Sequence, residues 1–190
     1  FRLGDLHVRK PYKKSKIFVI NCHTTIQCQS QLVKSLFEKY GGVRITLLPD
    51  KSFNINCYVD DSFEFLWGKR LPAGIFKYKE TAAAFIAGYT DAEGSFGLNQ
   101  GRGRFKIDSY DYPLLLKMNT FLKNYNVITK FRCIGRKNTI NYMGKRWNNN
   151  LWRLNINQAQ SIENFIKFIL PYLKHKKRLI DARKVLKNIH

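Results

Sequence analysis

The segment with the sequence IAGYTDAEG, at residues 86–94, constrains the fold of this chain more than any other segment. It continues an alanine-rich stretch at residues 80–85, and the composition of that stretch favours a helix. On this helix Ala84, Gly88 and Ala92 lie four residues apart, so small side chains line one face. Such a face lets a second helix approach almost to backbone contact. The pattern therefore predicts a helix that packs closely on another helix.

The predicted helix ends in an acid, Glu93, and Gly94 follows it as a C-terminal stop. A carboxylate in this position faces the negative end of the helix dipole, which costs roughly 0.3–1 kcal/mol. An acid in a position that lowers stability is a candidate for chemistry. Asp91, two residues earlier, is expected to point to the opposite side of the helix and to hold no ligand. The alternative is an amphipathic core helix with an incidental terminal acid.

The charge of the chain indicates a polyanionic partner. Its 190 residues include 34 Lys and Arg against 13 Asp and Glu, which gives a net charge of +21. An excess of this size is self-repulsive in isolation, and nucleic acid is the partner that explains it most simply. An acidic membrane surface is the alternative. Because 44% of the residues are hydrophobic, the chain is expected to fold around a core and not to be a disordered basic tail.

The sequence gives no indication of membrane insertion or secretion. It contains no run of about 18 apolar residues and no recognisable secretory signal. The cysteines are Cys22, Cys28, Cys57 and Cys133, and none belongs to a CxxC pair. Their spacing predicts neither a zinc site nor a disulfide framework, so we interpret them as small core residues of an intracellular protein.

Residues 79–190 are expected to form one half of the chain, and the helix described above is its first element. A strand is predicted at residues 104–109, and a helix with Pro113 in its first turn follows. The buried side of that helix is predicted to consist of Leu114, Leu115, Met118, Phe121 and Leu122. The later elements are predicted to be strands at residues 129–135 and 150–157 and helices at residues 161–170 and 174–189.

Residues 1–78 repeat this order of elements and are expected to form the other half. The predicted elements are a strand at residues 17–27, a helix at 31–40, strands at 43–48 and 53–59, and a short helix that begins after Asp61 and ends before Pro72. Ser30 is expected to cap the helix at residues 31–40, and Gly41 with Gly42 to end it.

The opening residues extend the repeat. If Leu3-Gly4-Asp5 is aligned with Asp91-Ala92-Glu93, Asp5 falls on Glu93 and Gly4 on the small Ala92. We therefore expect residues 3–5 to be the tail of a first copy of the signature helix, most of which would lie before Phe1. An aspartate in a turn, without any role, is the alternative.

Several predicted strands alternate between apolar and polar residues, so each is expected to have one buried and one exposed face. The exposed faces carry Arg, Lys, Asn, Gln, Thr and His with hardly any acid, unlike an ordinary solvated sheet. These are the side chains that contact guanine, adenine and phosphate in the major groove. The predicted DNA-binding residues are Asn21, His23, Thr25, Arg44, Asn54, Asn56, Arg102, Arg104, Lys106, Lys130, Arg132, Arg136, Arg153, Asn155 and Asn157.

Two other basic segments fit the same partner. The turn at residues 101–104, GRGR, is interpreted as a mobile hairpin tip that contacts DNA. The helix at residues 174–189 has an apolar side and many Lys and Arg residues, so it is expected to combine core packing with phosphate contact. A helix that lies on a membrane surface is the alternative for that segment.

The sequence of residues 86–94 resembles the signature of the LAGLIDADG homing endonucleases, and PYLKHK at residues 171–176 resembles a second segment of that family. The resemblance covers nearly the whole chain in the order of its elements. It implies an α+β fold of two pseudo-symmetric αββαββα halves, whose antiparallel sheets form a saddle, in one monomeric chain. It also implies site-specific cleavage of double-stranded DNA that leaves short 3′ overhangs, and an origin in a mobile intron or intein.

In this family two signature helices pack together, and their terminal acids hold metal ions over the DNA. The resemblance assigns that role to Asp5 and Glu93, which are expected to hold two or more Mg²⁺ ions for phosphodiester hydrolysis. It assigns to Lys174 the polarisation of the phosphate or the orientation of the attacking water; a lysine that only faces solvent is the alternative. Gln27 resembles the polar residue near the metal-bound waters. Because Ser109 occupies the matching place, the two sites are expected to be unequal.

An RNA intron maturase and a non-catalytic DNA-binding regulator on the same scaffold are the alternatives to a nuclease. The presence of both Asp5 and Glu93 favours the nuclease, because RNA binding does not require acids at helix ends. The many Lys, Asn, Ile, Phe and Tyr residues are typical of an A·T-rich genome, such as that of a mitochondrion or plastid.

Overall fold

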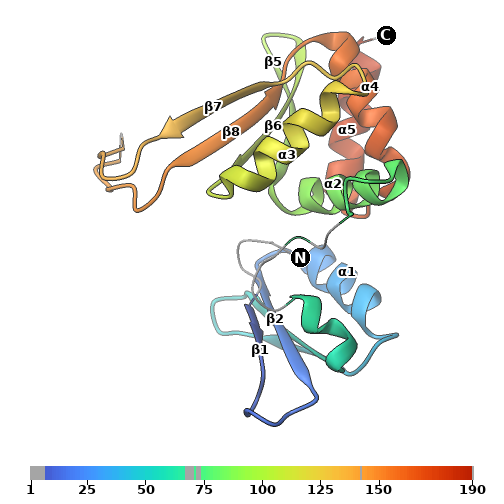
Figure 1. Ribbon diagram of the computed structural model, residues 1–190, viewed down its shortest axis with the longest axis vertical. Coiled ribbons are helices and arrows are strands. Elements are labelled where there is room, and N and C mark those ends of the chain that lie inside the picture. Colours follow the sequence, from blue (N-terminus) through green and yellow to red (C-terminus); the bar gives the residue numbers. More distant parts are fainter. Residues whose placement is uncertain (1–6, 67–70, 72–73, 142, 190) are drawn as a thin grey trace. The chain divides into compact units, whose positions relative to one another are not determined.

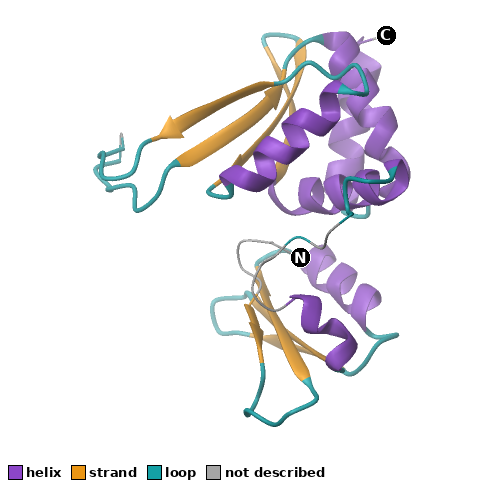
Figure 2. Cartoon of the chain, in the orientation of Figure 1, coloured by secondary structure: helices purple, strands orange, loops and turns teal. Residues whose placement is uncertain are grey.

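The computed structural model describes residues 7–66, 71, 74–141 and 143–189. The chain divides into two compact units, Phe1–Ala73 and Gly74–His190, each built on a four-stranded antiparallel sheet. In each unit the helices gather on one side of the sheet (Figures 1 and 2), so the opposite side is open. None of the helices in the described part of the chain has both the length and the apolar character needed to cross a bilayer.

The first unit has the strand order β1-β2-β4-β3. Its described elements are β1 (His7–Arg9), β2 (Phe18–Thr24), α1 (Gln27–Phe37), β3 (Val43–Leu47), β4 (Phe53–Val59) and the 3₁₀ helix η1 (Asp61–Leu66). The core lies between the sheet and these helices, where Phe18, Ile20 and Ile55 meet Phe37 and Leu66. Inward and outward residues alternate along β4, as the sequence predicts.

The second unit has the strand order β5-β6-β8-β7, with helices α3, α4 and α5 in contact with strands of this sheet. Its elements are α2 (Lys79–Glu93), β5 (Gly94–Asn99), β6 (Arg102–Ser109), α3 (Tyr112–Lys123), β7 (Lys130–Gly135), β8 (Leu151–Ile156), α4 (Ala159–Ile169), the 3₁₀ helix η2 (Leu170–Tyr172) and α5 (Lys176–Ile189). Its core contains three phenylalanines, with ring centroids 4.7 Å apart for Phe96 and Phe105 and 4.4 Å apart for Phe105 and Phe165. The α+β fold and the αββαββα order predicted for this half are confirmed, with α5 added after α4.

The hairpin between β5 and β6 differs from the prediction. Strand β5 is not predicted from the sequence, because the glycines at 94 and 97 weaken the strand pattern. The prediction of a mobile tip at residues 101–104 is wrong, because the turn consists of Gln100 (φ 51°) and Gly101 (φ 72°), the left-handed pair of a tight hairpin. Gly103 lies in β6, where a Cβ would be 2.7 Å from Cγ1 of Val185 in α5.

Helix α1 begins four residues earlier than predicted, because Thr24 ends strand β2. The Thr24 hydroxyl accepts a hydrogen bond from the amide of Ile26 (3.1 Å) and donates one to Oε1 of Gln29 (2.7 Å). This local turn replaces the strand with a helix start. The prediction that Ser30 caps the helix is therefore wrong: Ser30 lies within α1 and donates to the carbonyl of Gln27 at 2.8 Å.

Gly41 and Gly94 are required because other backbone atoms lie too close to leave room for a Cβ. Neither ends a helix in the left-handed conformation. Helix α1 ends at Phe37, and the nearby Gly41 lies so close to strand β4 that a Cβ would be 1.9 Å from the carbonyl oxygen of Tyr58. Gly94 follows α2 in an extended conformation (φ −76°), where a Cβ would be 2.7 Å from the carbonyl oxygen of Thr90. The predicted end of α2 is confirmed, but its physical reason is different.

Candidate nucleic-acid interface and catalytic residues

The small-residue face of α2 is uncovered within the second unit. Ala84 and Gly88 are exposed, and a Cβ added at Gly88 would meet no atom within 4 Å. The opposite side of the helix is buried in the unit through Ala83, Ile86 and Ala87, among others. Helix α2 therefore packs on its own unit through one side and presents the predicted helix-packing face on the other.

Glu93 is the last residue of α2, and it is partly exposed. Its carboxylate offers oxygen donors, and Mg²⁺ typically takes one or two protein carboxylates and completes its octahedron with water and phosphate oxygens. The donor chemistry of Glu93 therefore suits this ion. Among the described residues, no group of three or more His, Cys, Asp or Glu side chains gathers in one place. Asp5, the expected second ligand, lies outside the described residues, and its role stays a prediction.

Asp91 connects α2 to the segment that holds Lys174. Its Oδ2 accepts a hydrogen bond from the backbone N–H of Lys174 at 2.8 Å, and the amide of His175 also interacts with the carboxylate. Burial raises the pKa of Asp91, and these amides oppose the rise. Burial also lowers the pKa of the His175 imidazole, aided by the nearby Arg178. The side chain of Lys174 is exposed, while its backbone is held in place.

The prediction that Gln27 and Ser109 are equivalent is wrong. Ser109 ends β6 as Thr24 ends β2, and each hydroxyl accepts the amide two residues further on. Gln27 is the first residue of α1 and is exposed. Ser109 ends strand β6, and its hydroxyl accepts hydrogen bonds from the Tyr89 hydroxyl (2.7 Å) and the Asp111 amide (3.1 Å). Tyr89 belongs to α2, so the second unit fixes this hydroxyl between its signature helix and its sheet.

The open face of the second sheet presents basic residues in rows across its strands. One row consists of Lys106 on β6, Asn155 on β8 and Lys130 on β7. The next row places Arg153 beside Arg132. Near the hairpin end, Arg102 pairs with Asn99 and Arg104 with Gly97, and both arginines are exposed.

Arg153 has an acidic partner that was not predicted from the sequence. Its Nε and Nη2 donate to Oδ1 and Oδ2 of Asp108 at 2.6 and 2.7 Å, a bidentate pair between β6 and β8. The hydrogen bonds that Arg153 donates to Asp108 raise the pKa of Arg153. Because two donors of the guanidinium point at a carboxylate, Arg153 is less available to DNA than Arg132, Arg102 or Arg104. Alternate residues of a strand lie on one face, so Asp108 is expected on the same face as Arg104 and Lys106. This alternation could have revealed an acid among the basic residues.

The open face of the first sheet is rich in amides. The Asn21 amide group donates to the side-chain oxygens of Asn54 (2.6 Å) and Asn56 (3.0 Å). Asn56 pairs in turn with Arg44 on β3. These hydrogen bonds order the three amides relative to one another, so they form a fixed arrangement of donors and acceptors on this face.

His23 belongs to the same face and is held by residues of the β3–β4 turn. Its Nε2 lies 2.7 Å from the Ser52 hydroxyl, which donates to Oδ1 of Asp50 at 2.5 Å. The two hydrogen bonds from Ser52 lower the pKa of Asp50. Since the single proton of Ser52 points to Asp50, the Nε2 of His23 must be the donor in its bond with Ser52. Nothing in the sequence indicates that His23, Ser52 and Asp50 are joined by hydrogen bonds.

Three of the predicted DNA-binding residues lie outside the strands. Thr25 is in the bend before α1, Arg136 follows β7, and Asn157 follows β8. Asn157 accepts a hydrogen bond from the amide group of Asn155 at 3.1 Å. Thr25 and Arg136 are exposed.

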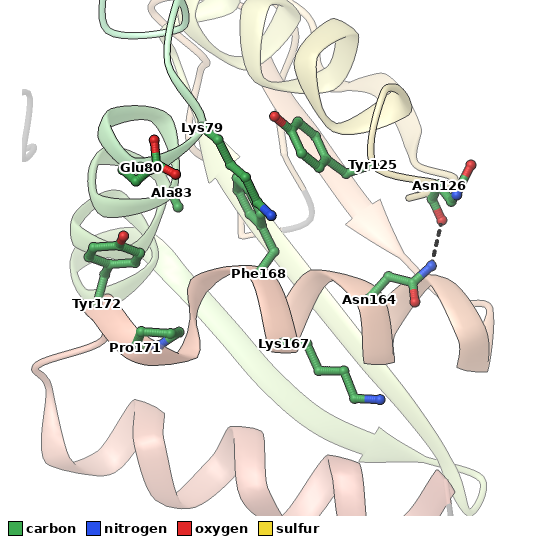
Figure 3. Close-up of a pocket in the computed structure, with 10 residues that line it drawn as sticks. All are labelled: Lys79, Glu80, Ala83, Tyr125, Asn126, Asn164, Lys167, Phe168, Pro171 and Tyr172. Carbon is green, nitrogen blue, oxygen red and sulfur yellow. Dashed lines mark hydrogen bonds between the residues drawn. The ribbon is translucent and has the colours of Figure 1, made fainter.

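The second unit also has a pocket of about 510 Å³ at the other end of α2 (Figure 3). Its lining includes Lys79 at the start of α2, Lys167 and Phe168 of α4, and Tyr125 after α3. Lys79 and Glu93 are the first and last residues of α2, about 20 Å apart along the helix axis. The pocket is therefore separate from the candidate catalytic end of the helix.

The sequence of the second unit matches a known protein family. Residues 80–169, which include the signature segment, match the LAGLIDADG-like domain. The second unit contains a LAGLIDADG-like domain. The matched range begins in α2 and ends with α4, so the LAGLIDADG-like domain covers the complete αββαββα order. The resemblance predicted from the sequence of residues 86–94 is thus confirmed.

Solved structures share the fold of nearly the whole chain, including its LAGLIDADG-like domain. I-DmoI in complex with DNA and Mn is 17% identical, with a TM-score of 0.58 over 87% of this chain and 88% of that chain. I-WcaI bound to its DNA recognition sequence is 11% identical, with a TM-score of 0.59 over 93% and 80%. Full-length DUF199/WhiA from Thermatoga maritima is 14% identical, with a TM-score of 0.56 over 98% of this chain and 57% of that chain. No curated protein sequence is significantly similar to the chain.

Proposed function

We propose that this chain is a site-specific double-stranded DNA endonuclease that uses divalent metal ions. The observation that carries the proposal is the uncovered small-residue face of α2, which ends at the carboxylate of Glu93. A helix that is buried on one side and shaped for a second helix on the other is suited to place its terminal acid beside a partner helix. The open, basic sheet of the same unit supplies the surface for a polyanion.

The solved structures support this proposal through their fold. I-DmoI has been solved with DNA in the presence of Mn and Ca, and I-WcaI with its DNA recognition sequence. At 11–17% identity these structures share the fold with our chain. The DNA and metal ions bound in those structures support the proposal for this chain, and so does its net charge of +21.

In the proposed reaction each part of the chain has a separate task. The rows of Lys, Arg and Asn side chains on the two sheets bind the duplex and fix its register. The carboxylate of Glu93 contributes a ligand for a divalent ion, and Asp5 is proposed to contribute another. When bound, such an ion lowers the pKa of a water and stabilises charge on the leaving oxygen of the phosphodiester. The ammonium of Lys174 contacts the scissile phosphate and Gln27 orients a water.

A DNA-binding regulator without catalysis is the second candidate. The sheet surfaces would serve binding alone equally well, because none of their contacts requires an acid at the end of α2. The fold is also that of DUF199/WhiA, of which the chain spans little more than half the length. A maturase would use the same basic surfaces for structured intron RNA.

The test is cleavage of a randomised duplex-DNA library by the wild-type chain and by Glu93→Gln, in Mg²⁺ and in Ca²⁺. Glu80→Gln is the matched control, because Glu80 is an acid in the first turn of the same helix. Wild type and Glu80→Gln are expected to cut one long motif, and Glu93→Gln to bind it within a few fold without cutting. Selective binding without cutting in any metal would favour the regulator. Loss of both would favour structured intron RNA as the partner.

A further inference from the structure

Asp91 and Glu93 lie in the same turn of α2 but face different directions. Two residues along an α-helix correspond to a rotation of roughly 200°, so the two carboxylates cannot serve one ion from the same side. Asp91 instead faces the segment between η2 and α5, where its Oδ2 accepts the backbone N–H of Lys174 at 2.8 Å. The two residues are 83 positions apart in the sequence.

The surroundings of Asp91 show that this contact is part of the folded unit. His175, the next residue after Lys174, is only 4% exposed, and its amide also interacts with the Asp91 carboxylate. The second oxygen of Asp91, the Nδ1 of His175 and the Nε of Arg178 are buried without a hydrogen-bond partner among the described residues. The carboxylate is thus committed to backbone amides in a place where it loses hydration, which is costly unless such hydrogen bonds compensate.

We propose that Asp91 is a positioning residue for Lys174, which it holds at a fixed distance from the end of the signature helix. The inference rests on the proposed nuclease, in which Lys174 contacts the scissile phosphate. It assigns separate tasks to the two acids of the signature: Glu93 serves the metal ion, and Asp91 anchors the lysine segment to the same helix. Both groups then move as one body, so that binding of DNA does not have to align them.

An alternative role is purely structural. Asp91 lies near the N-terminus of α5, which begins at Lys176, and an acid there stabilises a helix through the helix dipole. A structural acid would affect folding and every activity of the chain alike. A positioning residue affects only what Lys174 does, and its loss has no effect once Lys174 is gone.

A double-mutant cycle separates the two roles. Single-turnover cleavage of the target duplex is measured for Asp91→Ala, Lys174→Met and the double variant. Displacement of a catalytic group by about 1 Å can slow a reaction about 10²-fold, so Asp91→Ala is expected to slow cleavage by about that factor with DNA binding nearly unchanged. The double variant is expected to cut no more slowly than Lys174→Met alone. If the two losses multiply, the proposal is overturned.

Two further variants complete the cycle. Asp91→Asn keeps one oxygen that accepts an amide, so it is expected to restore most of the rate lost in Asp91→Ala. Asp181→Asn is the matched control, because Asp181 is an acid of α5 whose partner is the Lys177 ammonium at 2.6 Å. It is expected to cut at the wild-type rate, and a loss equal to that of Asp91→Ala would contradict a specific role for Asp91.

Amide hydrogen exchange tests the anchoring without any need for cleavage. The amides of Lys174 and His175 are expected to exchange faster in Asp91→Ala than in wild type, while those in the middle of α4 keep their protection. Unchanged exchange at both amides would overturn the proposal. A folded wild-type chain that cuts no DNA would instead refute the proposed nuclease, and the exchange data would still decide whether Asp91 holds this segment.

Discussion

Replacement of Gly41 by alanine is expected to destabilise the first unit and leave the second intact. The added Cβ would be 1.9 Å from the carbonyl oxygen of Tyr58, whereas real Cβ atoms essentially never come within 3.0 Å of another atom. The carbonyl must therefore move by about 1 Å. Tyr58 lies in β4, which pairs with β2 on one side and β3 on the other, so this movement disturbs hydrogen bonds in both ladders.

The cost follows from the bonds that must yield. Two or three ladder bonds at about 1 kcal/mol each, with a buried group left unsatisfied at about 1–3 kcal/mol, give about 3–6 kcal/mol. A unit of this size has a free energy of unfolding of only about 4–11 kcal/mol. The population of the open first unit is thus expected to rise about 10²–10⁴-fold, since 1.4 kcal/mol corresponds to a factor of ten.

Thiol labelling followed by mass spectrometry measures this population. Cys57 is buried, and burial raises its pKa to about 12, so it reacts at neutral pH only when the unit opens. Cys28 lies in α1 and is exposed, contrary to its interpretation as a core residue, and it serves as the internal reference. Gly42→Ala is the control, because a Cβ there would meet only the Tyr58 ring at 4.0 Å. Equal labelling of Cys57 in the Gly41 and Gly42 variants would refute the close-approach argument.

Three other predictions concern the face of α2, the open sheet and a buried thiol. Gly88→Leu is expected to leave the thermal unfolding of the second unit unchanged, because the site is open within that unit. It is expected to abolish cleavage, because the leucine fills the helix-packing face. Unaltered cleavage would exclude a helix partner at this face. Asp108→Asn is expected to free the Arg153 guanidinium to contact a DNA phosphate. One additional phosphate contact is expected to steepen the slope of log Kd against log salt concentration by about 1. Binding isotherms at several salt concentrations measure it, and Asp111→Asn is the control. Finally, the raised pKa of Cys57 predicts that the first unit loses stability from pH 9 toward pH 12, because the unfolded thiol releases its proton first. Denaturant unfolding at each pH should show this slope, and Cys57→Ala should remove it.

Local periodicity was sufficient to predict much of the second unit. The alanine-rich run and its small-residue spacing predicted α2, and the Pro113 helix start and apolar spacing predicted α3. Strand β5 was missed because glycine and serine dilute its alternation. The start of α1 was misplaced because a single hydroxyl, that of Thr24, ends the preceding strand.

The polar contacts of the candidate site were less predictable, because they join residues that are distant in sequence. The bond between Asp91 and Lys174 spans 83 positions, and the pair Asp108–Arg153 spans 45. Alternation could have placed Asp108 on the correct face, but only the register of β6 and β8 shows that it lies opposite Arg153. Periodicity therefore predicts which side of an element a residue occupies, and tertiary register decides which residue it meets.

The hydrogen bonds that occupy Ser109 bear on the order in which a duplex would be broken. Its hydroxyl accepts from both Tyr89 and Asp111, whereas Gln27 presents a longer, exposed amide at the start of α1. We therefore expect water to be oriented differently for the two strands and the proposed enzyme to nick one strand before the other. A nick can be resealed against its intact complement, so the lifetime of the singly cut intermediate, and not the first incision, would decide how often a target is lost.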